Sequence, residues 1–219
     1  MSMIKHGNVN FQAQESTAGM PPIPVGVYVG QIIGAKVENG EQGQNLILQL
    51  EVTEGEYAGY FKRQFEAQAG GQYQKRYKGT LRLRVPNYNS NGQPATDRDR
   101  YAHQDFQHMA WALEHSNSGY TFDWDETKLK GKACAFSVRE RDWFMEAAEE
   151  ERGYRTGTTT EIARLESLEA FREGKVKVPK KRGFSQRDQA RMAELDAAFS
   201  GGASTAETPQ LVTDETLPF

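Results

Sequence analysis

The chain has 219 residues and a mass of 24.6 kDa, which suits one ordinary domain with appendages or two very small domains. Its hydrophobic fraction is 37%, its mean hydropathy is −0.76, and no apolar run approaches the roughly 20 residues that cross a bilayer. The N-terminal residues lack the charged-then-apolar pattern of a secretory signal, and the single cysteine, Cys134, excludes an intramolecular disulfide and a multi-cysteine zinc site. We therefore expect a soluble cytoplasmic protein.

Basic and acidic residues are unevenly distributed along the chain. The net charge is −3, and residues 201–219 contain acids but neither Lys nor Arg, so the rest of the chain is balanced. Within it, residues 60–86 hold seven bases against the single acid Glu66. A second cluster at residues 175–191 holds seven bases against Asp188. Such patches favour an anionic partner, although the second cluster would equally suit the chain's own acidic end.

The first half of the chain predicts β-strands. Residues 1–22 are polar and are expected to form a flexible leader. Alternating apolar and polar positions, rich in β-branched side chains, predict strands at residues 25–33, 46–53, 60–65 and 81–85, the last two as one strand and its extension. In the last segment Leu81 and Leu83 alternate with Arg82 and Arg84, so one face is apolar and the other cationic. Pro86 ends it.

A helix and two further strands follow. Phe106, Met109, Ala110 and Leu113 have the spacing of one helical face, with Thr96 or Asp97 as the N-cap. Residues 133–138, which include Cys134, and residues 158–165 predict strands. Three strands, a helix and two strands are the element order of the OB-fold. The expected class is therefore mainly β, an OB-fold-like antiparallel Greek-key barrel with one helix after the third strand.

The domain organisation follows from changes in composition. Residues 23–174 are expected to form the barrel domain, and residues 175–200 a basic extension with one short helix at 185–199. Residues 201–219 are small, polar and acidic and predict a disordered tail.

The end of that tail combines acids with apolar side chains. Its residues are Asp214, Glu215, Thr216, Leu217, Pro218 and Phe219. Apolar side chains gain nothing from exposure on a disordered segment, so this pattern favours insertion of Phe219 into an apolar pocket of a partner. The α-carboxylate would then meet a Lys or Arg beside the pocket. The sequence predicts a partner-binding tip.

Four stretches in order along the chain resemble a family of bacteriophage single-stranded DNA-binding proteins. They are PVGVY at 24–28, EGEYAG at 54–59, residues 164–179 with EAFREGKVKVP, and DETLPF at 214–219. The resemblance implies a body that holds single-stranded DNA in the cytoplasm of a bacterial host. It also implies a flexible tip that recruits replication, recombination and repair proteins. Residues 68–127 match none of these motifs.

A stretch that interleaves rings and cations predicts the DNA-binding surface. Its candidates are Phe61, Lys62, Arg63, Tyr73, Lys75, Arg76, Tyr77, Lys78, Arg82, Arg84 and Tyr88, with Trp143 expected to cap the groove. Cations meet phosphates and rings stack on unpaired bases of any identity. Tyr73 and Tyr77 are the preferred stacking residues because they lie in a polar segment. The alternative is that Phe61 and Phe65 belong to the core and the lysines to a solvated face.

Catalytic patterns are weak. Asp123, Asp125, Glu126 and Lys128 loosely resemble a nuclease motif, but they fall in one polar turn, whereas a nuclease fixes such carboxylates around a metal. The sequence predicts no enzyme, no metal and no cofactor. A small phage nuclease or nuclease accessory protein is the alternative function, and an interaction module without DNA binding is a third. The oligomeric state stays open, a homo-oligomer included.

Overall fold

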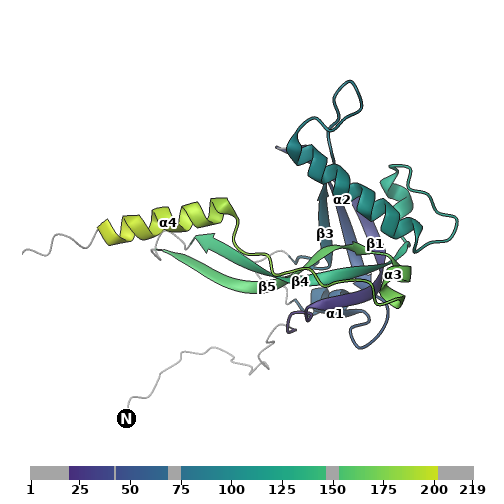
Figure 1. Ribbon diagram of the computed structural model, residues 1–219. Coiled ribbons are helices and arrows are strands. Elements are labelled where there is room, and N and C mark those ends of the chain that lie inside the picture. Colours follow the sequence, from purple (N-terminus) through teal and green to yellow (C-terminus); the bar gives the residue numbers. More distant parts are fainter. Residues whose placement is uncertain (1–19, 42, 69–74, 147–152, 202–219) are drawn as a thin grey trace, which may run out of the picture. The chain divides into compact units, whose positions relative to one another are not determined.

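The computed structural model describes residues 20–41, 43–68, 75–146 and 153–201 (Figure 1). It is mainly β, with a five-stranded antiparallel sheet in the order β3-β2-β1-β4-β5. The strands are β1 (Gly26–Gly40), β2 (Gly43–Val52), β3 (Thr80–Arg84), β4 (Ala133–Glu146) and β5 (Tyr154–Glu166). The helices are α1 (Tyr60–Ala67), α2 (Asp97–Glu114), the 3-10 helix η1 (Glu126–Leu129), α3 (Leu168–Arg172) and α4 (Gln186–Gly201). Among the described residues β3 and β5 do not pair, so the sheet is open.

The chain divides into two compact units. The first comprises the described parts of residues 1–140 and 160–181, and the second those of 141–159 and 182–219. None of the helices in the described ranges is both long and apolar enough to cross a membrane.

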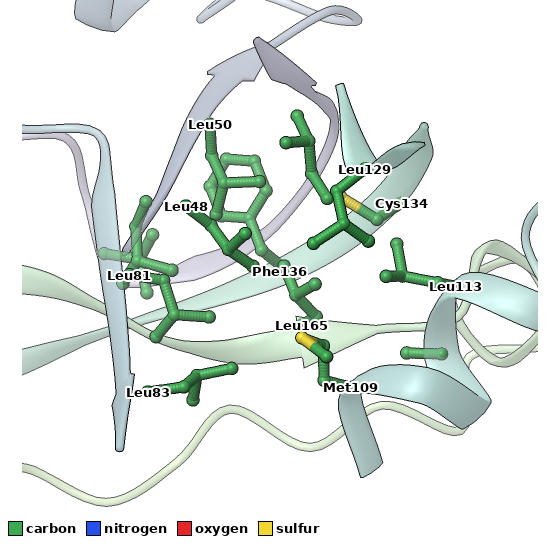
Figure 2. Packing of buried hydrophobic residues seen from close by; sticks show 14 of the residues in the cluster. Leu48, Leu50, Leu81, Leu83, Met109, Leu113, Leu129, Cys134, Phe136 and Leu165 are labelled. Carbon is green, nitrogen blue, oxygen red and sulfur yellow. The ribbon is translucent and has the colours of Figure 1, made fainter. Parts of the chain in front are cut away.

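The core of the first unit lies between the sheet and α2. Alternate residues of β2 and β3 point inward, among them Leu48, Leu50 and Leu81, and they meet Met109 and Leu113 of α2 (Figure 2). Cys134 and Phe136 of β4 and Leu165 of β5 complete this layer, and both β4 residues are fully buried. Full burial of one such side chain contributes roughly 1.5–3 kcal/mol. The strand predicted at residues 133–138 is confirmed as part of β4, and Cys134 in it is a core residue.

Residues 60–65 form the helix α1, so the strand predicted there is wrong. A carboxylate from a neighbouring strand accounts for the helix. Glu51 of β2 accepts hydrogen bonds from the backbone N–H groups of Phe61 (2.9 Å) and Lys62 (2.7 Å). These are donors that a helix N-terminus leaves unpaired. Gly59 precedes them with a φ of 71°, which glycine adopts at little cost.

The helix predicted after residue 96 is confirmed as α2. The Thr96 hydroxyl accepts a hydrogen bond from the backbone N–H of Asp99 at 3.1 Å, as an N-cap does. The helix ends at Glu114, and the Asn117 side chain donates to the Leu113 carbonyl at 2.8 Å. Phe106, Met109 and Leu113 are buried as the spacing predicted.

The second unit contains residues 141–146 of β4, residues 154–159 of β5 and the helix α4. Trp143 lies across Gly157, where an added Cβ would come within 2.7 Å of the indole. Glu146 accepts two hydrogen bonds from the guanidinium of Arg191, at 2.8 and 3.0 Å, which fastens α4 to β4. The helix predicted at residues 185–199 is therefore present and packs on a strand.

Candidate nucleic-acid interface

The outer face of β1, β2 and β3 carries a row of two cations with an aliphatic residue between them. Lys36 of β1 is opposite Ile47 of β2, and Ile47 is opposite Arg82 of β3. Lys36 and Arg82 are therefore two strand spacings apart, roughly 10 Å. Both side chains are more than half exposed, whereas Ile47 is only 5% exposed. Long cationic side chains can cover such a residue with their stems and keep their charges in water.

Glu38 lies between the two cations. Its carboxylate is 2.6 Å from Lys36 Nζ and 3.2 Å from Arg82 Nη2. The hydrogen bond from Lys36, together with the charge of Arg82, lowers the pKa of Glu38 below its ordinary value. Exposed ion pairs of this kind are worth little. The contacts of Glu38 with Lys36 and Arg82 therefore add little to the stability of the fold.

The neighbouring row of the same face is neutral and polar. Gly34 is opposite Gln49, and Gln49 is opposite Thr80. An added Cβ at Gly34 would lie 2.7 Å from Gln49 Oε1, so the glycine lets the amide lie close to β1. This row is flat and offers hydrogen-bonding groups, and both properties suit an extended polar ligand.

Arg84 does not belong to this exposed surface. Its guanidinium lies 3.4 Å from Asp99 Oδ1, and Asp99 is 1% exposed. Asp99 also accepts hydrogen bonds from the Thr96 hydroxyl (2.6 Å) and the Asn87 backbone N–H (3.1 Å). These hydrogen bonds, that of Thr96 foremost, lower the pKa of Asp99. Arg84 joins β3 to the start of α2, so its predicted role on the DNA surface is corrected to a structural one.

Two rings predicted to line the surface are parts of the core. Phe61 is 3% exposed and packs against Tyr60, Tyr77 and Phe136. Tyr77 is half-buried, and its hydroxyl donates to the Leu50 carbonyl (2.9 Å) or Glu51 Oε2 (2.8 Å). Burial and the adjacent carboxylate raise the pKa of Tyr77. Neither ring is free to stack on a base, so these two predictions are corrected.

The remaining cations of the predicted stretch are exposed near α1. Lys62 and Arg63 lie on α1 itself, and the Arg63 guanidinium donates to the Ala58 carbonyl. Lys75, Arg76 and Lys78 are exposed in the segment before β3, with the Lys75 ammonium 6.0 Å from the centre of the Phe65 ring. Tyr73 and the tip residues lie outside the described residues.

Two further predicted rings belong to other segments of the chain than the cationic row. Tyr88 is 41% exposed, and its hydroxyl hydrogen-bonds with His103 Nδ1 at 2.8 Å. Trp143 belongs to the second unit, where it is half-buried over Gly157.

The second basic cluster is divided between the two units and is partly neutralised in each. Lys175 pairs with Glu173 at 2.8 Å in the first unit, and Arg191 pairs with Glu146 and Glu194 in the second. In the acidic turn, Lys128 pairs with Asp123 and Asp125, and the Asp125 carboxylate accepts from the Thr127 backbone N–H at 3.0 Å. These carboxylates thus bind the turn together.

Sequence reasoning missed Lys36 and Glu38. They are isolated charges at the end of a strand, far in sequence from the basic stretch. The alternation of Lys36 and Glu38 around Val37 was the available signal, because it places both charges on one face of a strand. Neither the protein-family models nor the curated proteins include a match to this chain.

Proposed function

We propose that this protein binds single-stranded DNA without sequence specificity, on the outer face of β1, β2 and β3. The observation that carries the proposal is the exposed row of Lys36 and Arg82 beside the polar pair Gln49 and Thr80. Cations spaced along an open, polar surface meet phosphates, and such contacts carry no base information.

The strand order supports an OB-fold-like body. β1 lies between β2 and β4, β3 follows β2, and the long helix α2 lies between β3 and β4. An OB-fold is a five-stranded, partly open barrel that binds oligonucleotides on the face of its second and third strands and on the loops after its first and fourth strands. In the OB-fold-like body that we propose, the cationic row would lie on the corresponding face.

The proposal has a second part, the recruitment of replication, recombination and repair proteins by residues 214–219. Acids and apolar side chains together suit a basic, apolar pocket on a partner. Deleting these six residues is expected to abolish capture of such a partner and to leave DNA affinity unchanged or raised. Loss of DNA binding on deletion would contradict this assignment.

The test of DNA binding is a fluorescence-anisotropy titration with labelled oligo-dT and with a duplex of the same length. We expect tight binding of the single strand and much weaker binding of the duplex. Arg82→Gln should weaken single-strand binding. Arg100→Gln is the matched control, because Arg100 on α2 is also 57% exposed and also pairs with a carboxylate at 3.2 Å. Preference for duplex, or magnesium-dependent degradation of the strand, would overturn the proposal.

A further inference from the structure

The first unit contains a cavity between β1, β2 and the aromatic residues that follow β3. This hollow has a volume of about 410 Å³, and one side of it is formed by residues of β1 and β2 and by the residue after β3: Val37, Gln44, Leu46 and Val85. Its volume is in the range of small-ligand sites. Val37 lies between Lys36 and Glu38 on β1, so the hollow is separated from the cationic row by the thickness of one strand.

Aromatic rings from the segment that no motif covered form the opposite side. Phe106 and Trp124 stack at 5.3 Å with planes 14° apart, and Phe122 lies 5.5 Å from Trp124. Trp124 is still 54% exposed, so much of its ring faces water. Its φ of 66° is in the left-handed region that side chains other than glycine rarely adopt. Residues with strained backbone conformations of this kind cluster at active sites and ligand-binding sites.

The polar groups of the hollow are the side chains of Glu126 and Gln44. Glu126 is an acceptor and has no hydrogen bond or ion pair within the part of the chain that the structure describes. The amide nitrogen of Gln44 donates one of its two N–H groups to Asn39 Oδ1 at 3.1 Å, which leaves one N–H group and the carbonyl oxygen for a ligand. A ligand that complements them is planar, stacks on an indole and presents N–H groups at its edge.

We infer that this hollow binds one unstacked nucleobase with an exocyclic amino group, adenine, cytosine or guanine but not thymine, from a strand lying on the outer face. The inference rests on the proposed function. A carboxylate accepts a hydrogen bond from the exocyclic amino group of cytosine, adenine or guanine and finds no exocyclic donor on thymine. The cationic row binds phosphates of any sequence, and the hollow adds a preference at one nucleotide.

The experiment is ¹⁹F NMR of the full chain labelled with 5-fluorotryptophan, which separates Trp124 from Trp111 and Trp143. Replacement of each tryptophan by Phe assigns the resonances. We expect deoxyadenosine to shift the Trp124 resonance at lower concentration than thymidine does. Glu126→Gln should reduce that difference.

A matched pair of valines tests the hollow in strand binding. Val37→Phe fills it, whereas Val25→Phe makes the same change at an exposed residue just before β1 that does not line it. We expect Val37→Phe to weaken binding of oligo-dA about 5-fold or more, the loss of one stacked base, and Val25→Phe to have little effect. If Val37→Phe fails to fold, Glu126→Gln provides the comparison, with oligo-dT affinity as its internal reference.

The outcomes separate the two proposals. Oligonucleotide binding with an unmoved Trp124 resonance and equal affinities of the two valine variants overturns the base site and leaves the proposed function standing. A Trp124 shift with deoxyadenosine but no binding of any oligonucleotide overturns the proposed function instead, and leaves a nucleoside site.

Discussion

The described rings of residues 60–77 pack against the sheet, whereas four rings of residues 88–124 are exposed to solvent. Tyr60 and Phe61 are each 3% exposed, and Tyr77 is tied to β2 by its hydroxyl. In the second region Tyr88, Tyr101, Trp111 and Trp124 are between 41% and 61% exposed. The interleaving of rings and cations in the first region therefore indicates a helix packed on a sheet. The four exposed rings all lie within residues 68–127, which none of the family motifs covers.

The largest expected difference between the two regions is in unfolding free energy when one ring of each region is truncated. Phe61→Ala removes a ring packed among three others, so the free energy of unfolding should fall by about 3–5 kcal/mol. Tyr101→Ala, at a position that is 61% exposed, should change it by less than about 0.5 kcal/mol. Urea denaturation measures both. Equal losses would show that the two regions do not differ.

A smaller change tests whether Tyr77 is held by its hydroxyl. Tyr77→Phe keeps the ring but removes the donor shared by the Leu50 carbonyl and the Glu51 carboxylate. We expect a loss of roughly 1–3 kcal/mol in unfolding free energy with unchanged affinity for oligo-dT. If stability is unaffected and DNA binding weakens, Tyr77 is a stacking residue as the sequence first indicated.

The two arginines of β3 allow a structural side chain and an exposed one to be compared within a single strand. Arg84→Gln deprives the buried Asp99 of its cation and should lower the urea midpoint. Arg82→Gln, two residues away on the same face, should leave the midpoint nearly unchanged and weaken DNA binding. The opposite pattern would exchange the roles of the two residues.

The smallest expected effect concerns the pH dependence of stability. A hydrogen bond to Glu166 raises the pKa of His108 above its usual 6.5, against the effect of burial. A histidine with a raised pKa stabilises the folded state below that usual value, and the contribution is lost as the pH rises through the folded pKa. The excess stability of the wild type over His108→Gln should therefore shrink as the pH rises above about 6.5.

Local patterns were enough to predict part of the fold. The spacing of Phe106, Met109 and Leu113 and the cap at Thr96 predicted α2, because both signals lie within the helix itself. The alternation of Leu81 and Leu83 likewise predicted β3. Residues 60–65 were assigned wrongly because their conformation depends on Glu51, which caps α1 from another strand. When the capping residue is far from the helix in sequence, the residues of the helix itself carry no capping signal.

The candidate site was predicted less well than the fold, for a related reason. Arg82 and Arg84 look equivalent in sequence, and only the approach of Asp99 from α2 distinguishes them. Lys36 joined the surface through strand pairing with Ile47 rather than through its neighbours in sequence. Trp124 was overlooked inside an acidic turn, where nothing in the sequence marked its stacking on Phe106.

The salt dependence of oligo-dT binding tests the central claim most directly, since each phosphate neutralised on a single strand contributes about −0.7 to the slope of log affinity against log salt. We predict a steep slope for the wild type, a slope shallower by about 0.7 for Arg82→Gln, and an unchanged slope for the matched variant Arg100→Gln. A flat response of the wild type, or identical slopes for all three proteins, would contradict the assignment of the β1–β2–β3 face as the DNA-binding surface.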